Sequence, residues 1–363
     1  MKRYKAIFFA TAIIASTFLQ SEKAFSDDIN NQIKLPKGFK ISVFAENINN
    51  ARQLAIGSKG TVFVGTTQST VYAITPNKKV YKIATNLFHP NGVAFKNGSL
   101  YVGETNKISK YENIEANLDN PPKAKIIYDK LNSKTHHGYR YIKFSPEGKL
   151  YISIGMPCNV CEASEKKLGT ISKMNDDGSG FSVFSKGIRN SMGFDWSSKK
   201  ELWFTDNGRD FLGDDLPPDE VNKAENKNED FGYPYCHSGY ISDPDFGKKK
   251  SCSDFKKPEI NLKAHVAPLG LSFYKGKTFP AMYQNQIFIA EHGSWNRSKP
   301  IGYRIMNVFI KDNKAVEYNV FAEGWLKKDN NVIGRPVDIV NYNDGSILIS
   351  DDYSNKIYKI EYK

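Results

Sequence analysis

The chain has 363 residues and a formal net charge of +12, and 13% of its residues are aromatic. The positive excess comes mainly from lysines scattered along the chain, without an arginine-rich arm or a nucleic-acid-binding motif, so no nucleic acid partner is expected. Beyond the N-terminus, no stretch approaches the roughly 20 apolar residues of a transmembrane helix, so stable membrane insertion is not expected either. The 20 tyrosines and 23 phenylalanines favour strands.

The N-terminus has the three parts of a secretory signal peptide in the usual order. Three basic residues precede an uncharged apolar run over residues 6–19, and Ala24 and Ser26 supply the small residues of a cleavage site. We therefore predict a signal peptide over residues 1–26 and export to the periplasm or the exterior, although an uncleaved anchor would begin in the same way. The mature chain, residues 27–363, keeps a net charge of about +9.

A short strand pattern occurs six times in the chain. Each copy has a turn residue, a branched residue or leucine, an aromatic residue or leucine, another apolar residue and a small residue. The copies are Thr61–Gly65, Ser99–Gly103, Lys149–Ser153, Glu201–Thr205, Gln286–Ala290 and Ser346–Ser350. A second strand pattern precedes each copy, at Gln53–Ile56, Gly92–Phe95, Tyr141–Phe144, Gly193–Trp196, Gly270–Phe273 and Val337–Val340. Glycine-containing turns join the two strands in several copies, which is typical of hairpins.

Six hairpin units, mostly spaced roughly 35 to 60 residues apart, predict an all-β fold, a six-bladed β-propeller that forms one domain over residues 27–363. The longer fourth interval places an insertion near residues 210–265. The strand-like segment Phe39–Phe44 precedes the first unit, and we expect it to pair with the last blade and close the ring. A β-sandwich with coincidental spacing is the alternative.

The four cysteines are Cys158, Cys161, Cys236 and Cys252. Export favours disulfides, and of the three pairings that four cysteines allow we expect the local one, Cys158–Cys161 with Cys236–Cys252. A zinc site would use all four residues but lacks a second Cys-x-x-Cys. A thioredoxin-type motif would need a βαβ context, and a c-type haem site would need a following histidine.

In a propeller the loops at the ends of the central channel carry function, so residues that break the repeat are the candidates. His136 and His137 enter the third unit from a loop, and a histidine there is a candidate general base, although a structural histidine or a surface metal site has the same appearance. Arg189 and Asn190 open the fourth unit, where a guanidinium and an amide suit carboxylates and carbonyls or would brace two loops.

Two further groups of loop residues point to ligands. Carboxylates and glycines crowd residues 205–220, which suits calcium without matching the EF-hand spacing, although solvated acidic loops are common. Arginines and a lysine come from three different units, and together they would form a basic funnel for an anionic ligand. These cations are Arg189, Arg297, Lys299 and Arg335.

Four stretches taken together resemble the glucose/sorbosone dehydrogenase family of soluble quinoproteins, and they look closest to its sorbosone dehydrogenase branch. They are Gly187–Asn190, Leu202–Asp210, Asp230–Pro234 and His292–Arg297, and the resemblance runs from Leu35 to the C-terminus. It implies an enzyme that oxidises a sugar, an aldose or a related aldehyde or polyol by hydride transfer to pyrroloquinoline quinone, with calcium. The electron acceptor beyond the quinone is not indicated.

The resemblance also assigns roles to residues. It implies that His137 is the general base, with His136 beside it in the pocket. Arg189 and Asn190 would contact the cofactor, and Arg189 would stabilise charge that develops on it. Arg335, with Arg297 or Lys299, would hold the cofactor carboxylates. Carbonyl oxygens of Gly208 and Arg209 would bind a calcium ion acting as a Lewis acid, and Glu220 would join a separate structural calcium.

The chain departs from the family at one catalytic position. In glucose-oxidising relatives an aspartate shortly after the inner strand of the third blade orients the histidine, whereas here Met156-Pro157-Cys158 follows Gly155. Either another group orients His137 or the base is weaker, and glucose itself is not the expected substrate. Two other functions stay open, namely a ligand-binding propeller without enzymatic activity and a calcium-dependent lactonase-like hydrolase.

Overall fold

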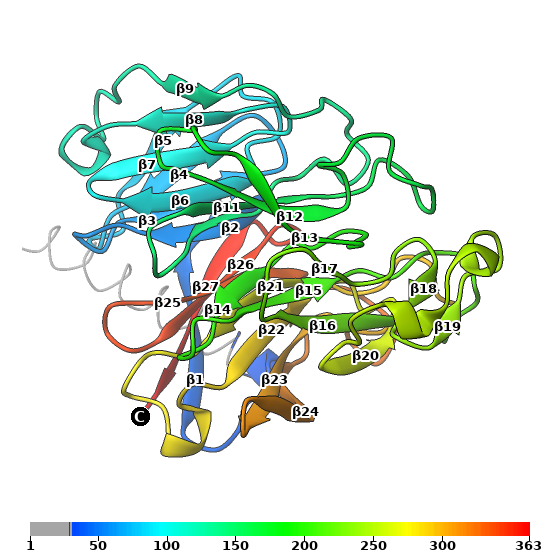
Figure 1. Cartoon of the computed structure of the whole chain (residues 1–363). Helices are drawn as coiled ribbons and strands as arrows, with labels where there is room; N and C mark the ends of the chain where they lie inside the picture. The colour runs from blue at the N-terminus through cyan, green and yellow to red at the C-terminus, as the bar shows by residue number, and fades with distance from the viewer. Residues whose placement is uncertain (1–28, 30) are drawn as a thin grey trace, which may run out of the picture.

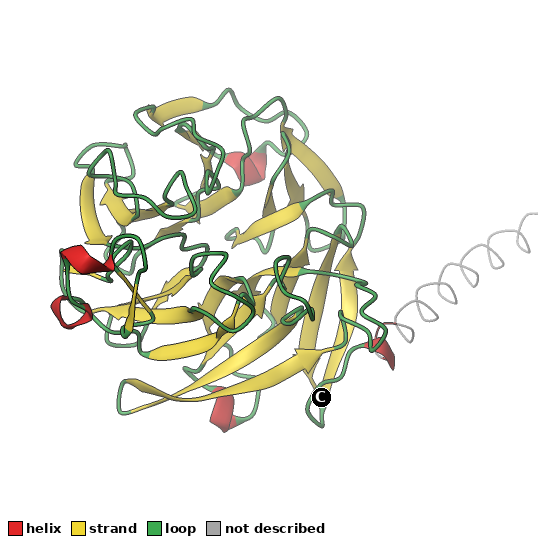
Figure 2. Cartoon of the chain, turned by 90° about the vertical axis from the view of Figure 1, so that its right-hand side faces the viewer, coloured by secondary structure: helices red, strands yellow, loops and turns green. Residues whose placement is uncertain are grey.

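The computed structural model describes residue 29 and residues 31–363, so the predicted signal peptide lies outside the described residues. Six sheets follow one another in chain order around a central channel, and their strand pairs are antiparallel except for one short edge pair in the third sheet, which confirms the six-bladed β-propeller (Figure 1). Short 3-10 helices are the main helical elements in the described part, and they lie at the edge of the ring (Figure 2). None of the described helices is long and apolar enough to cross a membrane.

The first three blades follow the predicted hairpins. Blade 1 contains β2 (Ala51–Ile56), β3 (Val62–Thr66), β4 (Val71–Ile74) and β5 (Val80–Ala84). Blade 2 contains β6 (Gly92–Lys96), β7 (Ser99–Gly103), β8 (Ile108–Tyr111) and β9 (Lys125–Tyr128), with η1 (Ile114–Ala116) in its last connection. Blade 3 contains β10 (Ile142–Phe144), β11 (Leu150–Ile154), β12 (Thr170–Met174), β13 (Ser182–Lys186) and β17 (Glu229–Asp230).

The last three blades complete the ring. Blade 4 contains β14 (Phe194–Trp196), β15 (Leu202–Asp206), β16 (Pro218–Ala224) and β20 (Ile260–Ala264). Blade 5 contains β21 (Pro268–Phe273), β22 (Ile287–Glu291), β23 (Arg304–Lys311) and β24 (Lys314–Glu323), with η4 (Ala281–Tyr283) after β21. Blade 6 contains β25 (Pro336–Asn341), β26 (Ile347–Asp351), β27 (Lys356–Tyr362) and β1 (Phe39–Ala45).

Burial explains why the sequence pattern was clearest in the second strand of each blade. The strands β3, β7, β11, β15, β22 and β26 are buried along their whole length, because neighbouring blades cover both of their faces. Outer strands such as β24 are mostly exposed or half-buried and therefore carry a weaker apolar signal. The hairpin turn at Asn97–Gly98 has φ values of 49° and 76°, which favours the asparagine–glycine pair found there.

The N-terminal strand closes the ring as predicted. In blade 6, β1 pairs antiparallel with β27, and Ile41 lies opposite Ile360. The innermost strands of different blades are also tied by polar side chains in the channel. Gln53 of β2 accepts hydrogen bonds from the amides of Val93 in blade 2, at 3.2 Å, and Ile142 in blade 3, at 3.0 Å.

The insertion lies within the predicted region but is shorter, because β16 and β20 inside that region belong to blade 4. Residues 225–259 carry β17, the hairpin of β18 (Cys236–His237) and β19 (Ile241–Ser242), and the turns η2 (Gly247–Lys249) and η3 (Cys252–Asp254). The Cys236–Cys252 disulfide closes this segment and a Cys158–Cys161 disulfide closes a loop of blade 3, which confirms the local pairing.

Candidate active site

A pocket of about 320 Å³ lies at one end of the channel, where the first strand of each blade begins and the second strand ends. That volume is within the range of small-molecule sites. Met192 and Leu269 give it an apolar part, and polar side chains supply most of the remaining wall. The residues that line the pocket are Arg52, His137, Tyr139, Arg189, Asn190, Met192, Asn207, Gly208, Asp210, Asp219, His265, Ala267, Leu269, His292, Trp295 and Asn296.

His137 lies in this pocket on a loop with a left-handed backbone conformation, at φ 49°. Its Nδ1 is 2.8 Å from the carbonyl oxygen of Met156. A carbonyl only accepts hydrogen bonds, so Nδ1 carries the proton and donates it, and in the neutral ring Nε2 is left as an acceptor. The main-chain carbonyl of Met156 therefore orients the ring of His137, although the sequence has no carboxylate at this place.

The surroundings of His137 keep its ring neutral. Burial is the main cause that holds the pKa of His137 well below its ordinary value of 6.5, and the positive charge of Arg189 and the neighbouring His136 act in the same direction. The hydrogen bond to Met156 opposes this shift only in part. At neutral pH the side chain is therefore an unprotonated base.

Gly155 packs against the loop that carries His137. A Cβ atom at residue 155 would lie 2.7 Å from the Cβ of His137 and 2.8 Å from its carbonyl oxygen. We therefore expect Gly155→Ala to displace this loop and to lower about tenfold or more any activity that depends on the position of His137. Steady-state kinetics together with a melting curve check this result, and wild-type turnover in a folded Gly155→Ala variant would contradict the close packing.

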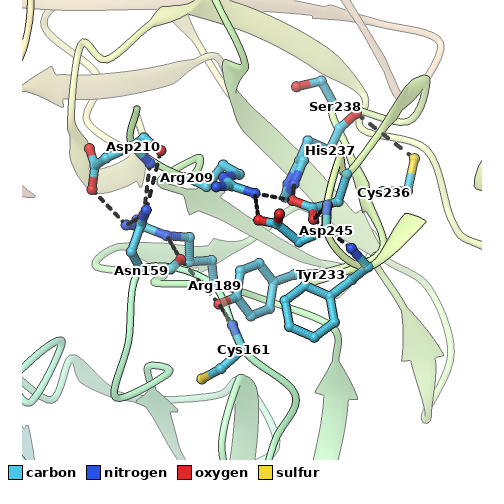
Figure 3. Close-up of polar contacts among 12 residues, drawn as sticks. Asn159, Cys161, Arg189, Arg209, Asp210, Tyr233, Cys236, His237, Ser238 and Asp245 are labelled. Carbon is cyan, nitrogen blue, oxygen red and sulfur yellow. Dashed lines mark hydrogen bonds and ion pairs between the residues drawn. The ribbon is translucent and has the colours of Figure 1, made fainter. Parts of the chain in front are cut away.

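Arg189 is held on several sides by the protein (Figure 3). Its Nε donates to the carbonyl of Asn159 at 2.8 Å and its Nη1 to the carbonyl of Asn207 at 3.2 Å. Its Nη2 donates to the side-chain oxygen of Asn159 at 2.9 Å and to the Asp210 carboxylate at 2.8 Å. The side chain of Arg189 is 4% exposed, so its charge acts in a poorly solvated place.

Buried carboxylates fix the backbone around the site. Asp206 accepts from the amides of Arg189 and Asn190, and Asp219 accepts from the amides of Gly208 and Ala267. Burial raises the pKa of Asp206 to about 6 and the pKa of Asp219 to about 7. These carboxylates set the shape of the pocket through main-chain hydrogen bonds.

The predicted cations do not all line the pocket. Arg189 does, whereas Arg297 donates to the carbonyl of Asp214 and pairs with the carboxylate of Asp215 at 3.0 Å. Lys299 is exposed, and Arg335 donates to the carbonyls of His292 and Gly293. The cofactor roles of these three residues stay predictions.

The other predicted residues are placed as follows. His136 is exposed, and its ring centroid lies 4.1 Å from that of His137. Gly208 lines the pocket, whereas the side chain of Arg209 points away from it and pairs with Asp243 at 2.5 Å (Figure 3). Glu220 accepts from the amide of Ser238 and from the side chain of Asn222, and burial raises its pKa. Within the described residues, no three or more His, Cys, Asp or Glu side chains are grouped so as to hold a metal ion.

Two pocket residues that lie close together had no role in the sequence-based prediction: Arg52, which it missed, and His292, which it included only as part of a motif. Asp352 bridges them, with 2.8 Å to Arg52 Nη1 and 2.8 Å to His292 Nε2. Arg52 directly precedes the first repeat and Arg335 lies two residues before the sixth, so a place near the entrance of a blade could have identified Arg52 as it did Arg335. His265, which also lines the pocket, has no comparable signal in the sequence.

Two oxygen atoms in the pocket are available to accept a hydrogen bond from a ligand or to bind a metal ion. The side-chain oxygens of Asn190 and Asn296 are buried, and neither has a hydrogen-bond partner among the described residues. Amide oxygens of this kind suit calcium, and the positively charged Arg52 and Arg189 suit an anionic organic group. The donors and acceptors of the pocket therefore fit a carboxylated cofactor with a calcium ion.

Comparison with known proteins identifies the family. Residues 33–363 match the model of the family described as TrAA12-like. The chain belongs to the TrAA12-like family. This membership confirms the resemblance to the soluble quinone-dependent sugar dehydrogenases, whereas the sorbosone dehydrogenase branch stays a prediction.

Individual relatives of this TrAA12-like chain differ in how much of it they match. An uncharacterized protein of Borreliella burgdorferi is 39% identical over 97% of each chain. The pyrroloquinoline quinone-dependent pyranose dehydrogenase of Coprinopsis cinerea is 28% identical over 29% of this chain and 16% of its own length. A solved structure of carbohydrate-active enzyme family AA12 from Trichoderma reesei superposes with a TM-score of 0.76 at 19% identity, over 92% of this chain and 98% of the other, which shows the shared fold.

Proposed function

We propose that this TrAA12-like protein is an exported quinoprotein dehydrogenase, which oxidises a sugar, an aldose or a related aldehyde or polyol with pyrroloquinoline quinone and calcium. The observation that carries the proposal is His137, a half-buried, neutral histidine whose Nδ1–H donates to Met156 and whose ring lies in the same pocket as Arg189. The family supports the same activity, since the Coprinopsis cinerea relative is a pyrroloquinoline quinone-dependent pyranose dehydrogenase.

The residues of the pocket would divide the work as follows. Pyrroloquinoline quinone, when bound, supplies the acceptor for the hydride that leaves the substrate carbon. His137 accepts the hydroxyl proton of the substrate at Nε2, while Met156 holds the ring. Arg189 presents a fixed positive charge to negative charge that develops nearby, and Arg52, restrained by Asp352, presents a second one.

A calcium ion would find its ligands among neutral oxygens. The carbonyls of Gly208 and Arg209 and the free amide oxygen of Asn296 are of the type that calcium prefers. Glu220 would join a separate structural calcium through the lone pairs that its present donors, Ser238 and Asn222, leave unused. Export is supported by the two disulfides, which are typical of oxidising compartments.

Titration of the cofactor-free mature chain, residues 27–363, with pyrroloquinoline quinone in the presence of calcium tests the proposal. We expect saturable binding and dye reduction with at least one member of a panel of aldoses, aldehydes and polyols. The same titration without calcium separates the role of the ion from that of the quinone. Failure to bind the quinone at saturating calcium would reject the dehydrogenase and favour the ligand-binding propeller or the lactonase-like hydrolase.

The pH dependence of the reaction gives a second test. The pKa of His137 lies below 6.5, so the protonated, inactive ring accumulates only below that pH. We therefore expect kcat/KM to stay level as pH falls through 6.5. It should decline only in more acid solution, where the pH passes the pKa of His137 in the folded protein. Rate profiles with saturating cofactor measure this, and a decline centred above 6.5 would be inconsistent with a buried, neutral base.

A further inference from the structure

The loop closed by the Cys158–Cys161 disulfide lies directly against Arg189. Asn159, inside this loop, accepts two hydrogen bonds from the guanidinium, one at its carbonyl from Nε and one at Oδ1 from Nη2. A guanidinium has five N–H donors in a fixed fork. Asn207 and Asp210 take two more, which leaves one N–H of Nη1 without a partner among the described residues. Asn159 therefore accepts two of the four hydrogen bonds that fix the direction of the remaining Nη1–H of Arg189.

Asn159 also fixes the counter-ion of Arg189. Its Oδ1 accepts from the amide of Asp210 at 2.8 Å, and its Nδ2 donates to the carbonyl of Asp210 at 3.2 Å. Asn159 is thus hydrogen-bonded to both members of the Arg189–Asp210 ion pair and fixes their relative positions (Figure 3). An alanine at this position would leave the Asp210 amide and one guanidinium N–H without these acceptors.

The disulfide restrains the backbone on both sides of Asn159. It joins residues only three positions apart, so the main chain of Asn159 and Val160 lies inside a small covalent ring. Tyr233 fastens the same ring from the insertion, because its hydroxyl donates to the carbonyl of Asn159 at 3.1 Å and accepts from the amide of Cys161 at 3.0 Å. A disulfide around so short a segment removes little chain entropy from the unfolded state, so it adds little to global stability.

We infer that the disulfide-closed loop Cys158–Cys161 is a positioning device for Arg189 and that Asn159 is the positioning residue through which it acts. The inference deepens the proposed function and rests on it for the role of Arg189. Four of the five guanidinium donors are already engaged, so a movement of Asn159 would turn the remaining Nη1 donor away from the pocket. The alternative is a disulfide that only stabilises the fold.

The two disulfides of the chain provide a matched pair of variants. Opening Cys236–Cys252, which spans 16 positions, is expected to lower the melting temperature more than opening Cys158–Cys161, which spans three. Their effects on Arg189 are expected in the opposite order. A disulfide that only stabilises the fold would affect both properties in the same order.

The first measurement is the NMR signal of the Arg189 Nε–H in the cofactor-free chain, identified by its absence in Arg189→Lys. We expect it to be protected from exchange with water in the wild type and in the Cys236→Ser/Cys252→Ser variant, and to exchange rapidly in Cys158→Ser/Cys161→Ser. Protection that survives in Cys158→Ser/Cys161→Ser would overturn the inference. This measurement needs no cofactor, so a wild type that binds no quinone would reject the proposed function and leave the inference to be decided here.

The second measurement is the dissociation constant for pyrroloquinoline quinone with calcium. We expect Asn159→Ala to bind about tenfold more weakly, as for the loss of one hydrogen bond to a charged group, and Asn159→Asp, which keeps an acceptor for Nη2, to recover most of that loss. The Asn159→Ala variant is expected to keep the protected Nε–H signal, because the carbonyl acceptor stays in place. Wild-type affinity in both Asn159→Ala and Cys158→Ser/Cys161→Ser would overturn the inference.

Discussion

Replacement of His137 by asparagine is expected to lower kcat about 10²- to 10⁴-fold, the range for loss of a general base. Asparagine keeps an N–H group that can donate to the Met156 carbonyl but has no basic nitrogen at the position of Nε2. The loop and the pocket would therefore persist while proton removal fails. Rapid mixing of substrate with the quinone-loaded variant, followed by the absorbance of the cofactor, measures the chemical step directly.

A glutamine at the same position serves as the matched control. His137→Gln carries an acceptor further along the side chain but is not basic either, so both variants are expected to bind the quinone within a few-fold of the wild type and to turn over slowly. If either variant kept more than about a tenth of wild-type kcat, the proton would have to leave by another route, and His137 would not be the base.

Arg189 is expected to give the second large effect. Arg189→Ala would leave the Asp210 carboxylate, which is 16% exposed, without its partner, and removing one member of a buried ion pair costs about 3 kcal/mol of folding free energy. Quinone affinity and kcat should both fall. The decline of activity in acid should also move towards pH 6.5, because the charge of Arg189 is one cause of the lowered pKa of His137.

Arg189→Lys separates the charge from the geometry of the guanidinium. Lysine keeps the positive charge but cannot make the planar set of bonds to Asn159, Asn207 and Asp210. We expect its pH profile to resemble that of the wild type and its quinone affinity to resemble that of Arg189→Ala. Equal affinity in Arg189→Lys and the wild type would mean that charge alone is used at this position. Calorimetric titration and a pH–rate series on the three proteins decide between these outcomes.

The sequence was sufficient for the fold because burial imposed one pattern six times. The fully buried second strands contain mainly apolar and small residues, so the repeat can be recognised from the sequence alone. Closure by β1 and the local disulfides could also be predicted. The exact extent of the insertion could not, because β16 and β20 of blade 4 lie within the same stretch of polar residues.

The site was less predictable because much of it depends on main-chain atoms. The group that orients His137 is the carbonyl of Met156, and a carbonyl leaves no signature in residue identity. The sequence predicts that Arg297 and Arg335 form part of a basic funnel for an anionic ligand, yet each of them donates to carbonyl oxygens of neighbouring loops. Pairing of this kind depends on the path of the loops, whereas the positions of His137 and Arg189 at blade entrances follow from the repeat itself.

The pairing of β1 with β27 has a consequence for how the molecule is made. The strand β1 is synthesised long before its partner β27, because blade 6 is the one sheet whose strands come from both ends of the described chain. Ring closure therefore cannot occur before β27 has been synthesised. A chain interrupted before β27 would expose the edge of β26 and leave β1 unpaired, and unpaired strand edges of this kind favour aggregation.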